Sequence, residues 1–162
     1  MIRCIIVDDE PLAVVQLEKY VERVPFLVNV GSCSSAAEAM EILSSGNVDA
    51  MFVDINMPDI DGVQLVRSLS HPPMVVFTTA YSEYAIEGFR LDAVDYLLKP
   101  IAFDDFLKAS NKLNRSFNTA RQVAEPADTV ANDCLYVKSD YRMLRVPINS
   151  IKYIESMSEY VR

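Results

Sequence analysis

The sequence from residue 50 to residue 58 reads AMFVDINMP. An apolar run precedes Asp54 and a proline closes the stretch, which is typical of a buried strand that ends at a polar residue and enters a turn. Similar short apolar runs lie on both sides, at Cys4–Val7, Leu27–Val30, Met74–Phe77 and Val94–Leu98. We therefore predict five strands, of which Ala50–Val53 is the third.

Between these strands, apolar residues recur at the spacing of helices with one buried face. The stripes comprise Ala13, Leu17, Tyr20, Val21 and Val24; Ala36, Ala39, Met40 and Leu43; Leu65, Val66 and Leu69; Ala85, Ile86 and Phe89; and Phe103, Phe106, Leu107 and Leu113. Strands two, four and five are nearly continuous apolar runs, which predicts burial on both faces. Alternating strands and helices with right-handed crossovers favour an α/β fold, an open doubly wound parallel sheet in the order 2-1-3-4-5.

Composition limits the possible compartments and partners. The 162 residues include 15 basic and 23 acidic ones, and this net charge of -8 argues against nucleic acid as a partner of the molecule as a whole. The acidic excess lies in residues 1–132, which include 10 basic and 19 acidic residues, whereas residues 133–162 include 5 basic and 4 acidic ones.

Cys4, Cys33 and Cys134 are too far apart for a zinc site, so reduced thiols are expected. No leader peptide opens the chain and no apolar stretch reaches the roughly 18 to 20 residues of a membrane span, so we expect a cytoplasmic protein without a membrane partner.

Charged and hydroxyl-bearing residues follow four of the predicted strands. They are Asp8, Asp9 and Glu10 after the first strand, Asp54 after the third, Thr78 and Thr79 after the fourth, and Lys99 after the fifth. For Asp8 and Asp9 alone, capping of the next helix is an equally good interpretation. The carboxyl ends of parallel strands meet at one edge of the sheet, where such folds bind ligands. The joint placement therefore favours a functional site.

The residue types suit phosphoryl transfer. Clustered carboxylates repel one another and need a cation, and all-oxygen ligands suit Mg²⁺ or Mn²⁺. A carboxylate oxygen of Asp54 can attack a phosphoryl donor, while the cation and the Lys99 ammonium neutralise the charge on the transferring group. Thr79 supplies a hydroxyl to the phosphoryl oxygens. Pro58 and Gly62 bracket the loop after Asp54, which indicates a tight turn before the next helix.

Residues 1–118 resemble the receiver domains of bacterial two-component response regulators. The segments that carry the resemblance are Val7–Pro11, Val53–Pro58, Asp61–Gly62, Thr79–Ala80 and Tyr96–Pro100. The resemblance implies a flavodoxin-like receiver that acts as a phosphoacceptor signalling protein. It further implies that Asp54 takes the phosphoryl group from a phosphohistidine of a sensor histidine kinase and loses it slowly.

The same resemblance implies roles for the residues around Asp54. Asp9, Asp54 and the Asn56 main-chain carbonyl would hold Mg²⁺, with Asp8 acting mainly through a water on the metal. Thr79 and Tyr96 would form the switch pair, although residue type alone makes Tyr96 an ordinary half-buried strand aromatic. Lys99–Pro100 is expected to be a cis peptide that places the amine. Asn56 and Tyr81 lie two residues after Asp54 and Thr79, so we expect them to flank the phosphoryl group.

Phosphorylation is expected to move the face formed by the fourth helix, the fifth strand and the fifth helix. This face could support a homodimer, and the residues expected to contribute are Tyr84, Ile86, Arg90, Asp95 and Lys108. The physical basis of that expectation is that the face has two conformations and that phosphorylation favours one of them.

The C-terminal part of the chain changes character. Residues 119–132 have the composition of a linker, and residues 133–162 show the strand pattern of a second domain, at Leu135–Val137, Met143–Val146 and Ile151–Glu155. This stretch resembles the opening of the LytTR (LytR/AlgR) DNA-binding domain, in the run from Tyr136 to Val161. The chain stops well before the end of that module, so we expect a truncated chain whose full-length form binds DNA as a transcription regulator.

Three other functions are less well supported by the sequence. A dinucleotide-binding oxidoreductase needs a G-x-G-x-x-G turn, and the chain's four glycines are scattered. A phosphatase that forms an aspartyl-phosphate would resemble families with a second Asp two residues after the first. This chain has Asn56 at that position. Turnover of a phosphate ester would distinguish that alternative. An interaction domain that accepts no phosphate is a further alternative, but such a domain would not need an acidic residue at each of positions 8, 9 and 54.

Overall fold

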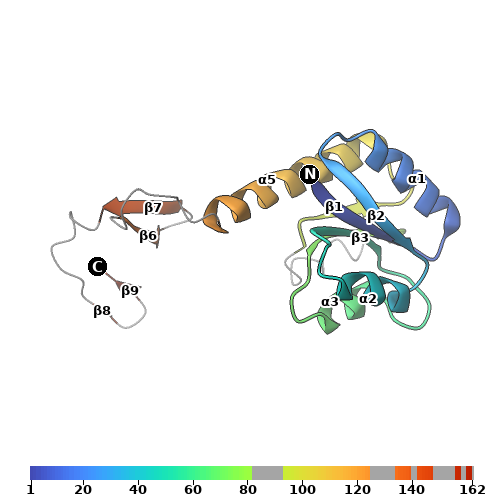
Figure 1. The fold of residues 1–162 in the computed structure, drawn as a ribbon, viewed down its shortest axis with the longest axis horizontal. Helices are drawn as coiled ribbons and strands as arrows, with labels where there is room; N and C mark the ends of the chain where they lie inside the picture. Colours follow the sequence, from blue (N-terminus) through green and yellow to red (C-terminus); the bar gives the residue numbers. More distant parts are fainter. Residues whose placement is uncertain (82–92, 125–133, 140–141, 148–155, 158–159, 162) are drawn as a thin grey trace. The chain divides into compact units, whose positions relative to one another are not determined.

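The computed structural model describes residues 1–81, 93–124, 134–139, 142–147, 156–157 and 160–161 (Figure 1). The chain divides into two units, Met1–Ala124 and Glu125–Arg162. The predicted fourth helix, with Tyr84, Ile86 and Arg90 around it, lies outside the described residues, as does the predicted strand Ile151–Glu155.

The described strands of the first unit form one five-stranded parallel sheet in the order β2-β1-β3-β4-β5 (Figure 1). The strands are β1 (Ile2–Val7), β2 (Leu27–Cys33), β3 (Ala50–Asp54), β4 (Met74–Thr79) and β5 (Asp95–Leu98). The predicted α/β fold and strand order are therefore confirmed. Burial departs from the expectation for strands two and five. The inner strands β3 and β4 are buried or nearly so, whereas β2 and β5 are partly exposed because they form the two edges of the sheet.

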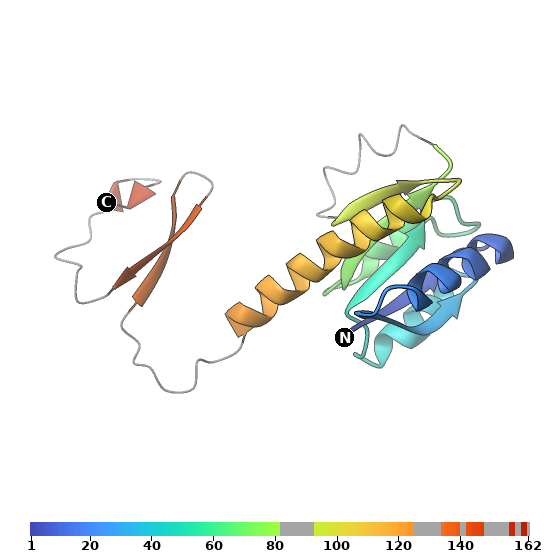
Figure 2. The same ribbon diagram turned by 90° about the horizontal axis from the view of Figure 1, so that it is seen from above.

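Helices cover both faces of this sheet. Figures 1 and 2 show α1 (Pro11–Glu22) and α5 (Phe103–Ala124) on one face, and Figure 1 shows α2 (Ala36–Ser44) and α3 (Gly62–Ser68) on the other. Alternate residues of β1 serve the two layers, since Ile6 packs with α1 and α5 whereas Ile5 packs with α2 and α3. Phe52 of β3 stacks on Phe106 of α5, with ring centroids 5.0 Å apart. These layers hold the strand ends in fixed positions.

The start of α3 lies against the end of β3. Asp61 and Gln64 form a reciprocal capping box, in which each side chain accepts a hydrogen bond from the other residue's backbone N–H. The Gly62 N–H donates to the Ile55 carbonyl at 2.9 Å, and a Cβ on Gly62 would overlap the carbonyl oxygen of Asp54. A glycine is therefore required for α3 to begin this close to Asp54.

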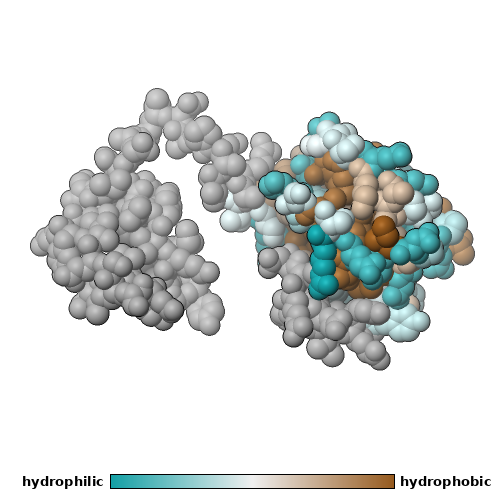
Figure 3. Space-filling view, turned by 90° about the horizontal axis from the view of Figure 1, so that it is seen from below, coloured by the Kyte–Doolittle hydropathy of each residue, from teal (hydrophilic) through white to brown (hydrophobic). Residues whose placement is uncertain are grey.

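Apolar and polar side chains share the surface of the first unit. Figure 3, seen from the side that α2 and α3 cover, shows brown apolar patches between teal hydrophilic residues. Among the described residues, no helix combines the length and the apolar character that crossing a membrane requires.

The C-terminal part is described in separate pieces. Helix α5 continues to Ala124, past the limit of 118 that the sequence suggests for the receiver, because residues 116–124 contain no glycine or proline to end it. In the second unit, β6 (Cys134–Ser139) pairs antiparallel with β7 (Arg142–Pro147), and β8 (Ser156–Met157) with β9 (Tyr160–Val161). The domain limits themselves stay a prediction.

Candidate functional site

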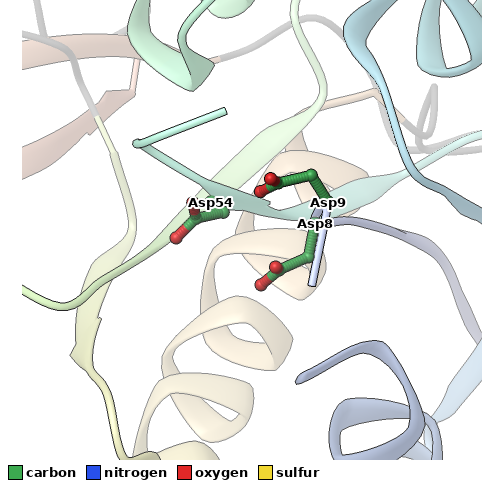
Figure 4. Close-up of side chains that lie close together, drawn as sticks. All are labelled: Asp8, Asp9 and Asp54. Carbon is green, nitrogen blue, oxygen red and sulfur yellow. The ribbon is translucent and has the colours of Figure 1, made fainter. Parts of the chain in front are cut away.

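Three carboxylates meet at the carboxyl edge of the sheet. Asp8 and Asp9 follow β1 directly, and Asp54 is the last residue of the adjacent strand β3. Each offers a carboxylate oxygen within 4.8 Å of the others. Figure 4 shows the carboxylates of Asp8 and Asp9 extending from the end of β1 toward Asp54. Asp8 and Asp54 are buried and Asp9 is exposed, so the cluster opens to solvent on one side.

Lys99 brings a positive charge between two of these carboxylates. Its Nζ lies 2.8 Å from Asp8 Oδ2 and 3.1 Å from Asp54 Oδ1, and Glu10 Oε2 lies 3.8 Å away. The Lys99 side chain is only 17% exposed. Its backbone N–H donates to the Thr79 carbonyl at 2.7 Å, and the following peptide bond, Lys99–Pro100, is cis as predicted. The ammonium is therefore held inside the site.

The environment shifts the proton affinities of Asp54 and Lys99. Burial raises the pKa of Asp54 above its ordinary value, although the Lys99 ammonium opposes this shift, and the Asp8 charge adds to it. Burial would lower the pKa of Lys99, but its bonds to Asp8 and Asp54 outweigh burial and raise it. Lys99 therefore stays charged and helps to keep Asp54 ionised.

Backbone donors fix the orientation of the two buried carboxylates. The Asn56 N–H donates to Asp54 Oδ2 at 3.0 Å, and the Glu10 N–H donates to Asp8 Oδ1 at 3.0 Å. The Ile55 N–H donates to the Thr78 carbonyl at 2.9 Å, which ties the chain after β3 to β4. The carboxylates are thus oriented by the loops that follow their strands.

Thr79 and Tyr96 lie on the neighbouring strands β4 and β5. Thr79 is buried, and its Oγ1 accepts a hydrogen bond from the Tyr81 N–H at 3.1 Å. Tyr96 stacks on Phe77, with centroids 5.3 Å apart, and its hydroxyl is buried without a hydrogen-bond partner among the described residues. Burial raises the pKa of Tyr96, so the hydroxyl keeps its proton. The switch role of the pair stays a prediction.

The donor set fits a hard divalent cation. The three carboxylates provide oxygen ligands close together, and Lys99 alone leaves the cluster with excess negative charge. Such a cluster suits Mg²⁺ or Mn²⁺, which bind carboxylates and keep part of their water shell. Asn56 is exposed beside the cluster, and its carbonyl as a ligand stays a prediction.

The structure adds two features that the sequence analysis did not assign. Glu10 lies near the Lys99 ammonium, and the buried Thr78 hydroxyl has no hydrogen-bond partner in the described part of the chain. The sequence placed both residues at strand ends, but strand position reveals neither the contact of Glu10 with Lys99 nor the burial of the Thr78 hydroxyl without a described partner.

The fold and this acidic edge define a phosphoacceptor signalling domain. The response regulator receiver domain family matches residues 4–111. The chain therefore belongs to this family, and it is the receiver of a two-component response regulator. The predicted receiver is confirmed.

Known relatives agree with this assignment. The chain is 36% identical over 159 residues to transcriptional regulatory protein YpdB of Escherichia coli K12, covering 95% of this chain and 65% of that protein. It is 45% identical over 103 residues to transcriptional regulatory protein BtsR of the same strain, covering 62% of this chain and 43% of the relative. The crystal structure of the response regulatory domain of MrkE from Klebsiella pneumoniae matches with a TM-score of 0.66 and 36% identity, over 73% of this chain and 99% of that one. The chain thus spans about two thirds of the length of YpdB, whose similarity continues beyond the receiver.

Proposed function

We propose that Asp54 accepts a phosphoryl group from a phosphohistidine of a sensor histidine kinase. An Asp54 oxygen forms the new P–O bond, the P–N bond of the donor breaks, and the imidazole leaves with a proton. The observation that carries the proposal is the Lys99 ammonium, 3.1 Å from Asp54 Oδ1 and 2.8 Å from Asp8 Oδ2. From this position it favours the ionised nucleophile and counters the charge of the transferring group.

Asp8, Asp9 and Asp54 would hold Mg²⁺ or Mn²⁺, with the Asn56 main-chain carbonyl as a further ligand. When bound, the cation offsets the repulsion between the carboxylates and the phosphoryl oxygens. The chain's own contribution is to keep two carboxylates buried and oriented and to leave Asp9 accessible from solvent. This arrangement fits entry of a donor from the side of Asp9.

Thr79 and Tyr96 would transmit the phosphorylated state. In the present structure the Thr79 hydroxyl is engaged by the Tyr81 N–H, and the Tyr96 hydroxyl has no described partner. A phosphoryl group on Asp54 would offer the Thr79 hydroxyl a charged acceptor, and that new bond would bias β4 and β5 toward a second arrangement.

The face of β5 and α5 would then support a homodimer. A groove of about 570 Å³ runs along it, and the lining includes Asp95, Leu98, Lys108, Lys112 and Arg115. Leu98 is 53% exposed although it lies on a strand. Asp95 bonds Lys112 at 2.8 Å and Lys108 bonds Asp105 at 2.8 Å, so acidic and basic groups alternate over this face. Such a surface suits a second copy of itself.

The full-length protein would regulate transcription in the cytoplasm through a LytTR-type DNA-binding domain. Support comes from YpdB, a transcriptional regulatory protein whose similarity covers 95% of this chain. The antiparallel pair β6 and β7 includes residues 136–138, where the stretch that resembles the start of that domain begins.

Intact-mass spectrometry with acetyl phosphate and Mg²⁺ tests the proposal. The parent should gain one phosphoryl group, and Asp54→Asn should gain none. Asp59→Asn is the matched control, because Asp59 is exposed in the same loop and its positive φ of 68° is one that asparagine tolerates. Normal modification of Asp54→Asn would contradict the assignment, and continuous turnover of a phosphate ester would favour a phosphatase instead.

A further inference from the structure

Helix α1 holds the loop that carries Lys99. The Ile101 carbonyl, two residues after Lys99, accepts one hydrogen bond from Gln16 Nε2 at 3.1 Å and another from the Tyr20 hydroxyl at 3.1 Å. The two donors also contact each other, with Gln16 Nε2 lying 3.0 Å from the Tyr20 oxygen. Both lone pairs of the Ile101 carbonyl therefore accept hydrogen bonds from residues that lie 85 and 81 positions earlier in the sequence.

The Tyr20 ring is fixed independently of this bond. It packs edge-on against Phe103, with centroids 5.2 Å apart, and against Phe106 at 5.5 Å. The Arg23 guanidinium lies 3.5 Å from the centroid of the Phe103 ring. A phenylalanine at position 20 would keep these ring contacts, so the contribution of the hydroxyl can be separated from that of packing.

The segment Lys99–Ile101 is held at both ends. The Lys99 N–H donates to the Thr79 carbonyl at 2.7 Å, and the Ile101 carbonyl is held by the pair on α1. The Ile101 side chain is buried as well. Between these attachments, the Lys99 side chain reaches into the acidic cluster. A shift of the Ile101 end would move the backbone from which the ammonium extends.

We propose that Gln16 and Tyr20 are positioning residues for phosphoryl transfer to Asp54. They act through Lys99, because they fix the backbone that aims its ammonium at Asp54, and the inference rests on the proposed function of that pair. Catalytic groups lose effect when their position relaxes by a fraction of an ångström to an ångström. Neither residue touches the reacting atoms.

The test measures the rate constant of Asp54 phosphorylation by acetyl phosphate in Mg²⁺ for Gln16→Met, Tyr20→Phe and the double variant. We expect a loss of about threefold for each single variant and about tenfold for the double variant, since each substitution removes one of the two hydrogen bonds to the Ile101 carbonyl. Lys19→Met is the control, because Lys19 lies exposed on the same helix. Its rate should equal that of the parent.

A Lys99→Met background shows whether the effect runs through Lys99. There the double substitution should change the rate by less than about twofold, because no ammonium remains to be positioned. The inference would be overturned if the double substitution left the phosphorylation rate unchanged in the chain that retains Lys99. It would also be overturned if the double substitution lowered the rate as much in the Lys99→Met background as in that chain. Failure of the unsubstituted chain to take up phosphate would instead overturn the proposed function and the inference with it. Tyr20→Phe alone preserves the aromatic packing, so it keeps the test decisive if the double variant is unstable.

Discussion

Replacing Lys99 by methionine should destabilise the metal-free protein and do so more as the pH rises from acid to neutral. The substitution removes the charge but keeps a long apolar side chain. Asp8 and Asp54, whose side chains are 0% and 5% exposed, would then lose the ammonium that lies within about 3 Å of each. Their charges would be left buried without a cation.

The expected loss can be estimated from these contacts. Removing one partner of a buried ion pair destabilises proteins by about 3 to 5 kcal/mol. Proton uptake by Asp54, whose pKa is already raised by burial, offsets part of that loss. We therefore expect the free energy of unfolding to fall by about 3 kcal/mol at neutral pH, the lower end of that range.

The sign of the pH dependence follows from the two pKa shifts. Near the ordinary aspartate pKa and below it, Asp54 takes up a proton, so the missing ammonium costs less stability there. Because the folded Asp54 has a raised pKa, its contribution to stability falls as the pH rises above the ordinary aspartate value, and the loss is larger without Lys99. The parent's advantage should persist up to and beyond the ordinary lysine pKa, because the bonds to Asp8 and Asp54 raise the pKa of Lys99 above that value.

Urea unfolding in EDTA, followed by circular dichroism between pH 4 and pH 9, measures this difference. Lys112→Met is the matched control, because Lys112 is 54% exposed in its contact with Asp95 and should change the free energy by less than about 1 kcal/mol. Equal losses in the two variants, or a Lys99→Met loss that does not vary with pH, would show that Lys99 does not compensate the buried carboxylates.

Three further predictions concern the same edge of the sheet. Gly62→Ala should lower the free energy of unfolding by about 1 to 3 kcal/mol and slow phosphorylation, because its Cβ would overlap the Asp54 carbonyl oxygen; an unchanged urea midpoint would contradict this. Tyr81→Glu should speed loss of phosphate from Asp54 without a large change in Mg²⁺ affinity, because a carboxylate at this position could orient water where the ring crowds its approach; equal or slower decay of the phosphoprotein would refute it. A phosphoryl mimic should increase the light scattering of the parent but not that of Lys108→Glu, which reverses a charge in the groove between β5 and α5. Identical scattering of the two proteins would show that this face is not the dimer interface.

The sequence predicted the part of the site that depends on strand ends. Asp8, Asp54 and Lys99 each follow an apolar run, and a parallel sheet necessarily brings such positions to one edge. Strand limits moved by a few residues, as for β2, which continues from the predicted Val30 to Cys33. Pairing with β1 extends that strand through polar positions that an apolar pattern does not reveal.

Other contacts could not be predicted because they depend on how helices pack. The bonds from α1 to the Ile101 carbonyl join residues 85 and 81 positions apart, and they require the rotation of α1 against the loop after β5. Tyr20 fitted the apolar stripe of its helix, so the sequence indicated burial of the ring but gave no sign of the hydroxyl's partner. The closeness of Gly62 to Asp54 likewise follows from the entry of α3, which no spacing reveals.

The role of Asp54 as the phosphoryl acceptor can be tested by locating the phosphoryl group chemically. The chain should be phosphorylated with acetyl phosphate in Mg²⁺, treated with borohydride to reduce the aspartyl phosphate to homoserine, digested, and analysed by tandem mass spectrometry. We predict homoserine at position 54 and at no other aspartate. Homoserine at position 8 or 9 with none at position 54, or phosphate recovered on a serine or histidine, would show that Asp54 is not the phosphoryl acceptor.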